Sequence, residues 1–158
     1  MNIAADLLAR LQFLLRVAQR ECAHLQATNQ RVFDVPFTGE RARKLDTDAD
    51  FAERVEAFAA RFSRLQDTLG DKLIPTLLRA LGEPVGVALD NLDRAERLGW
   101  LASADEWMAA RRLRNQMIHE YIEDPLILAS ALNAAHAHVP MLAATCAALQ
   151  TEMARRTG

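Results

Sequence analysis

Residues 51–69 of this chain read FAERVEAFAARFSRLQDTL. The large apolar side chains of this stretch step by four and three residues, at Phe51, Val55, Phe58, Phe62, Leu65 and Leu69. This spacing is typical of a helix that packs along a shared seam with antiparallel neighbours. Asp50 and Glu53 predict where the helix begins, and Gly70 predicts where it ends.

The rest of the chain shows the same helical periodicity and lacks the alternation expected of strands. Further helices are expected at about 3–27, 75–81, 104–121 and 125–153, with another running from the glycine turn at 82–86 to 98. Ser103 and Glu106 form a capping-box pattern, and Asp124 before Pro125 predicts an N-cap followed by a first-turn proline. The predicted fold class is all-α, an up-and-down bundle of four longer helices with short ones between them.

The length of 158 residues predicts a single domain spanning residues 1–158. A stretch at about 28–48 contains Pro36, Gly39 and many charged residues, which indicates a flexible or variable connector. No unbroken apolar run is long enough to span a bilayer, and the N-terminus lacks the features of a secretory signal. Cys22 and Cys146 are far apart in sequence, and each is interpreted as a buried free thiol. These features predict a cytoplasmic protein without membrane association.

The charge composition limits how the chain could hold nucleic acid. With 19 basic and 21 acidic side chains, the formal net charge is −2. This value argues against an electrostatic grip by the whole surface, but it leaves room for a local basic patch.

Residues 103–121, SADEWMAARRLRNQMIHEY, contain the side chains that are best suited to take part in a reaction. One helical stripe contains Trp107, Ala110, Arg114, Met117 and Tyr121. A guanidinium group in an apolar seam is costly unless it is paired or lies at an interface. On the neighbouring face, the side chains of Arg112, Asn115 and His119 align at spacings of three and four, and Arg111 lies nearby.

These residue types suit the cleavage of a phosphodiester bond without a metal. Histidine exchanges protons near neutral pH, and arginine binds phosphate through two donors. On an ideal helix, however, Arg114 and His119 are separated by roughly 140°. Either the helix loosens near His119, or a second copy of the chain completes the site across a two-fold axis. By pattern alone, an Arg and a His on one helix are more often a solvated or satisfied pair.

Residues 114–121, RNQMIHEY, fit the pattern R-x4-H-x-Y. This motif resembles that of the HEPN superfamily, in particular the HepT-like toxins of type VII HEPN/MNT toxin–antitoxin pairs and related nucleotidyltransferase substrate-binding proteins. The resemblance implies a homodimeric helical bundle in which Arg114 and His119 are catalytic and Asn115 supports the phosphate or the histidine. It also implies that the hydroxyl of Tyr121 receives AMP from the partner nucleotidyltransferase.

The sequence therefore predicts a metal-independent endoribonuclease toxin with no cofactor, supported at its site by Arg111 and Arg112. Its expected partners are a second copy of the chain, an RNA substrate and an MNT-type nucleotidyltransferase antitoxin. One alternative is a non-catalytic partner or substrate-binding module of the nucleotidyltransferase. Another is a helical interaction protein whose motif helix is only a dimer seam, in which case Trp107→Ala would break the dimer.

Overall fold

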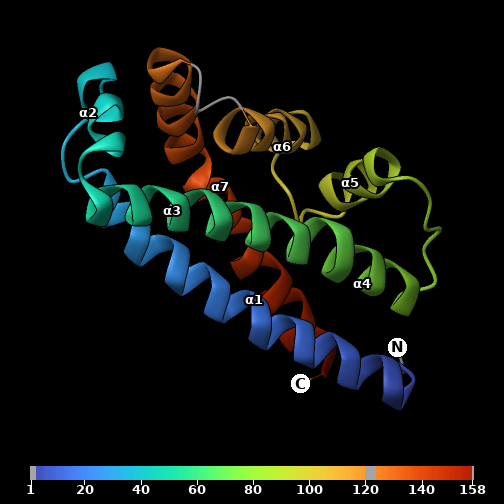
Figure 1. The fold of residues 1–158 in the computed structure, drawn as a ribbon. Helices are drawn as coiled ribbons and strands as arrows, with labels where there is room; N and C mark the ends of the chain where they lie inside the picture. Colours follow the sequence, from blue (N-terminus) through green and yellow to red (C-terminus); the bar gives the residue numbers. More distant parts are fainter. Residues whose placement is uncertain (1–2, 120–123, 158) are drawn as a thin grey trace.

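The computed structural model of the chain describes residues 3–119 and 124–157, and the side chain of His119 lies outside the described part. Figure 1 shows the arrangement of the elements. Their order is α1 (Ala5–Val32), α2 (Gly39–Arg43), a 3-10 turn η1 (Lys44–Asp46), α3 (Ala49–Asp67), a π-helical segment η2 (Thr68–Leu73), α4 (Ile74–Ala80), α5 (Ala88–Arg97), α6 (Ala104–His119) and α7 (Pro125–Thr157). Within these described residues every regular element is helical, so the predicted all-α class is confirmed.

The core lies where the long helices meet. Figure 1 shows α1 running alongside α3 and α4 in the opposite direction, while the C-terminal part of α7 packs against α1. All six apolar positions of the seam predicted in residues 51–69 are buried. They share one cluster with leucines of two other helices, among them Leu11, Leu14, Leu25, Leu132, Leu142 and Leu149. Burying each such side chain contributes about 1.5–3 kcal/mol, so this shared seam is what holds the bundle together.

Gly70 does not end a helix, and this prediction was wrong. The backbone continues from α3 through η2 into α4 as one rod, and the Ile74 amide donates to the Leu69 carbonyl, five residues back. A Cβ atom on Gly70 would lie only 3.0 Å from Nε1 of Trp107. Gly70 is therefore needed for the close approach of the Trp107 ring, and the helix continues because Leu69, Leu73 and Ile74 remain buried.

Side-chain caps mark the starts of α3, α6 and α7, although not always at the predicted residues. The Phe51 amide donates to Oδ1 of Asp48 at 3.1 Å, so Asp48 caps α3 in place of Asp50. The Glu106 amide donates to Oγ of Ser103 at 3.1 Å, which confirms the Ser103 half of the predicted box. The Leu126 amide donates to Oδ1 of Asp124 at 2.9 Å, as expected before Pro125.

The predicted connector at 28–48 is largely helical. Helix α1 extends to Val32, and α2 and η1 occupy residues 39–46. Arg41 fastens this segment, because its Nη1 atom donates to the carbonyls of Val32 and Val35 at 3.0 and 2.8 Å. The same guanidinium lies over the rings of Phe37 and Phe51, at 5.1 and 4.8 Å from their centroids.

Helix α7 is long and apolar enough to cross a membrane by length and composition alone, although it contains no long unbroken apolar run. Within the bundle, 44% of its most apolar stretch is buried. Core positions such as Leu132, Leu142 and Leu149 explain that composition equally well, because a helix buried on one side is rich in apolar residues.

Candidate functional site

Helix α6, which contains the motif residues 114–119, packs against α7, α3 and α5, and its Trp107 ring reaches η2 at Gly70. Trp107, Ala110 and Met117 face inward and are buried, as predicted for their stripe. The Gln66 side-chain amide, itself buried, donates to the carbonyl of Trp107 at 3.0 Å. Because Trp107 is fully enclosed within its own protomer, it cannot contact a second copy. Trp107→Ala would therefore not break a dimer directly, so this variant does not test whether the motif helix is only a dimer seam.

Arg114 forms a two-point ion pair with Asp67 of α3. Its Nη1 and Nη2 atoms donate to the two carboxylate oxygens of Asp67 at 2.5 and 3.1 Å. The Arg114 side chain is only 21% exposed, and its Nε atom is buried with no hydrogen-bond partner in the described part of the chain. The pair satisfies the sequence-based expectation that a charge in this apolar seam needs a partner.

Arg111 forms a second ion pair one turn away. Its Nη1 atom donates to Oδ1 of Asp71 at 2.9 Å. The hydrogen bond that Arg111 donates to Asp71 raises the pKa of Arg111 above its ordinary value, so Arg111 remains a fixed cation. Asp67 and Asp71, four residues apart across the start of η2, thus match Arg114 and Arg111 on the antiparallel helix α6. The sequence contained both carboxylates but gave no sign that they would meet the motif.

Arg112 and Asn115 lie on the outer face of α6 and are exposed. Neither makes a side-chain hydrogen bond to another described residue. They line a surface hollow of about 460 Å³ together with Met108, Arg111, Arg114 and Ile118. Three arginines and one asparagine therefore border a single solvent-open hollow, and among the described residues no carboxylate lines it. This is a suitable environment for a phosphate group.

The other two motif residues are His119 and Tyr121. Helix α6 keeps its α-helical backbone through His119, but the His119 side chain and all of Tyr121 lie outside the described residues. An unbroken helix retains the angular separation of roughly 140° between Arg114 and His119. Of the two routes that the sequence left open, loosening of the helix near His119 finds no support in the backbone between Arg114 and His119.

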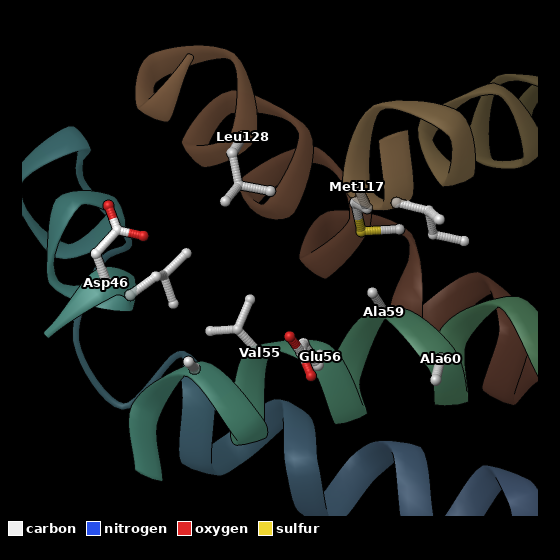
Figure 2. A pocket seen from close by; sticks show the side chains of 10 residues that line it. Asp46, Val55, Glu56, Ala59, Ala60, Met117 and Leu128 are labelled. Atoms are coloured by element: carbon white, nitrogen blue, oxygen red, sulfur yellow. The ribbon is translucent and has the colours of Figure 1, made fainter. Parts of the chain in front are cut away.

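A second cavity, which sequence reasoning missed, lies beside the end of α6. It has a volume of about 400 Å³ and is formed by η1, α3, the end of α6 and the start of α7. Figure 2 shows Val55 and Leu128 pointing toward each other across it, with Met117 on one side and Asp46 on the other. No sequence pattern could reveal this cavity, because its walls come from four separate elements and its apolar residues by themselves resemble core positions.

Titratable side chains also have polar partners elsewhere in the bundle. Nδ1 of His138 lies 3.2 Å from Oε1 of Glu106, and Nδ1 of His136 lies 2.7 Å from Oδ1 of Asn29. Cys22 of α1 and Cys146 of α7 are buried free thiols that hydrogen-bond to each other. Within residues 3–118 and 124–157, no three His, Cys, Asp or Glu side chains gather in a way that could hold a metal ion.

The comparisons with known proteins add no relative. The chain matches no protein-family model, no curated protein and no solved structure. Its membership of the HEPN superfamily therefore stays a prediction from the motif on α6.

Proposed function

We propose that the chain is a HEPN-like, metal-independent endoribonuclease of the HepT-like kind, acting in the cytoplasm as a homodimer and neutralised by a nucleotidyltransferase partner. The observation that carries this proposal is the hollow on α6, where Arg111, Arg112, Arg114 and Asn115 border one open space just before His119. The proposal adds no cofactor and no membrane attachment.

The hollow supplies the phosphate-binding half of the reaction. Arg112 and Asn115 are exposed and free to donate to the non-bridging oxygens of a phosphodiester. Arg114 gives two of its donors to Asp67, which leaves one hydrogen on each terminal nitrogen for a phosphate. In this arrangement Arg112 has the least encumbered guanidinium, a ranking that the sequence motif alone did not provide.

His119 supplies the proton-transfer half. It removes the proton from the ribose 2′-hydroxyl, whose oxygen then bonds to phosphorus, while the bond from phosphorus to the 5′-oxygen breaks and that oxygen takes up a proton. The products are a 2′,3′-cyclic phosphate and a free 5′-hydroxyl. Because α6 stays helical through His119, the histidine that complements Arg114 is best supplied by a second copy, whose symmetric contact would place two arginines and two histidines in one cleft.

An RNA cleavage assay in EDTA tests the proposal with protein prepared without any nucleotidyltransferase. We expect the wild-type chain to leave cyclic phosphate ends, and His119→Ala to lower the rate by at least about 100-fold. Arg112→Ala and Arg114→Ala should also be impaired. His24→Ala is the matched control, because His24 is an exposed histidine on α1. Retained cleavage in both Arg114→Ala and His119→Ala would contradict the proposal.

One observation favours a second candidate function. Asp71 and Asp67 already partner two of the three arginines, so less positive charge is available to RNA than the motif suggested. A non-catalytic module that presents Tyr121 to a nucleotidyltransferase would not need that charge. If neither wild type nor variants cleave RNA, AMP transfer to the wild-type chain but not to Tyr121→Phe would support this second function.

A further inference from the structure

The apolar cavity between η1, α3, α6 and α7 has the dimensions and chemistry of a ligand pocket. Its volume of about 400 Å³ lies within the range of small-molecule sites. The deeper walls are the buried side chains Val55, Ala59, Met117 and Leu128, which present hydrocarbon and one thioether to whatever enters. Figure 2 shows these side chains coming from different helices and surrounding one space.

Two carboxylates stand at the rim of this pocket. Asp46 of η1 and Glu56 of α3 both line it, and both are exposed. Neither forms an ion pair with a cation of the described residues. An ionised carboxylate accepts hydrogen bonds but donates none, so the rim repels phosphate and attracts a group that presents N–H donors.

The pocket adjoins the arginine hollow on α6. Ile118, which is 45% exposed, lines both cavities and forms the wall between them. An apolar slot with acceptors at its rim therefore lies next to a cationic surface. This is the order of chemical groups along a nucleotide, in which a flat base with polar edges is joined through the sugar to a phosphate.

We infer that this pocket binds a nucleobase of the RNA strand whose phosphate lies on Arg112 and Asn115, and that Glu56 selects guanine. The inference rests on the proposed ribonuclease function and names the specificity subsite of that same site. The base is held between the Met117 and Leu128 side chains. Guanine is favoured because its Watson–Crick edge presents N1–H and N2–H side by side, which one carboxylate can accept together, whereas uracil offers a single N–H there.

A second protein chain is a poorer occupant of the pocket. The centres of protein–protein interfaces are depleted in charged residues, and covering this pocket would desolvate Asp46 and Glu56 without giving either a cation from the described residues. A base leaves the rim open to water while it fills the apolar interior. A second copy nevertheless remains an outcome that the experiment must distinguish.

Fluorescence anisotropy with short, labelled 2′-O-methyl oligouridines tests the inference, because the blocked 2′-oxygen prevents cleavage. Oligomers with one central guanosine should bind the wild-type chain about tenfold more tightly than uridine alone, as expected for hydrogen bonds to a charged group. Glu56→Gln should remove most of this difference. Glu53→Gln, on the same helix but facing another surface hollow, should keep it.

Filling the pocket provides an independent variant. Ala60 is exposed at the pocket edge, so Ala60→Phe adds bulk without removing a core side chain, and it should weaken binding of the guanosine oligomer about tenfold. Ala57→Phe places the same ring beside another surface hollow and is the control. Gel filtration of each variant is required, because a second copy in the pocket predicts that Ala60→Phe alters the oligomeric state.

The outcomes separate this inference from the proposed function. RNA cleavage that depends on His119, with equal binding by wild type, Glu56→Gln and Ala60→Phe, would overturn the inference and leave the ribonuclease intact. A dimer that dissociates in Ala60→Phe without change in base preference would also overturn it. If the wild-type chain binds no RNA and cleaves none, both proposals fail.

Discussion

At the scale of single residues, the ion pair between Arg114 and Asp67 is the contact that most affects how the motif is interpreted. A buried charge is tolerated when a partner satisfies it with good geometry, and the two-point contact with Asp67 does so. In the pair of Arg111 and Asp71 the arginine is the more exposed of the two arginines, 36% against 21% for Arg114, while the two carboxylates are about equally exposed. Comparing the two pairs therefore measures how burial of the arginine changes the contribution of an ion pair to stability.

We predict that Asp67→Ala costs about 1–2 kcal/mol of unfolding free energy, because it leaves the partly buried Arg114 guanidinium without its acceptor. Asp71→Ala should cost less than about 1 kcal/mol, since water can replace the lost acceptor beside the more exposed Arg111. Urea denaturation of both variants measures the difference. Equal losses would show that the enclosure of Arg114 contributes nothing to the pair.

At the scale of elements, the π-helical segment and the motif helix are fitted to each other. Segment η2 sits between α3 and α4 and contains Gly70, whose missing side chain lets the Trp107 ring approach the backbone. The same segment presents Asp71 to α6. π-helical turns often occur at functional sites, and here the turn brings a packing contact and an ion pair to the helix that carries the proposed chemistry.

We predict that Gly70→Ala lowers the unfolding free energy by about 1–2 kcal/mol despite the better helix propensity of alanine. The new Cβ would lie 3.0–3.3 Å from three atoms of the Trp107 ring, which is fully buried. Gly86→Ala is the control, since its Cβ would meet its nearest neighbour at an ordinary 3.6 Å. Thermal or urea unfolding of the two variants decides the matter, and a Gly70→Ala protein as stable as the wild type would contradict the prediction.

At the scale of the whole molecule, the bundle joins residues that the sequence keeps far apart. The Cys146 thiol donates a hydrogen bond to the Cys22 sulfur, which lowers the pKa of Cys22 from 9.0 to about 7 against the opposing effect of burial. The hydrogen bond with Cys22, together with burial, raises the pKa of Cys146. As the pH increases, Cys22 therefore loses its proton below the ordinary thiol pKa, and Cys146 loses its proton above it.

We predict that the folded protein titrates one thiol near pH 7, observed as thiolate ultraviolet absorbance. Between pH 7 and 9 the unfolded chain binds more protons than the folded one, so the unfolding free energy should increase as pH increases across that window. This gain in stability should be lost as the pH is lowered through 7. In Cys146→Ala, Cys22 loses its donor and both effects should disappear. A wild-type titration with no step below the ordinary thiol pKa would refute the prediction.

Much of the fold was predictable because helix periodicity and capping are local properties. The buried seam of residues 51–69 and the caps at Ser103 and Asp124 follow from side chains within a few residues of one another. Gly70 misled the prediction because a glycine that ends a helix and one that admits a neighbouring ring look the same in sequence. The connector was misjudged for a similar reason, since its polar composition concealed the distant contacts of Arg41.

The sequence by itself determined the helical class, the motif helix and the need for a partner to Arg114, because each depends on spacing along one helix. Only the tertiary structure decided that this partner is Asp67, that Arg112 and Asn115 remain open to solvent, and that an apolar pocket adjoins them. Those outcomes depend on how separate helices cross. That geometry is fixed by the packing of all their side chains together, so no single stretch of sequence contains it.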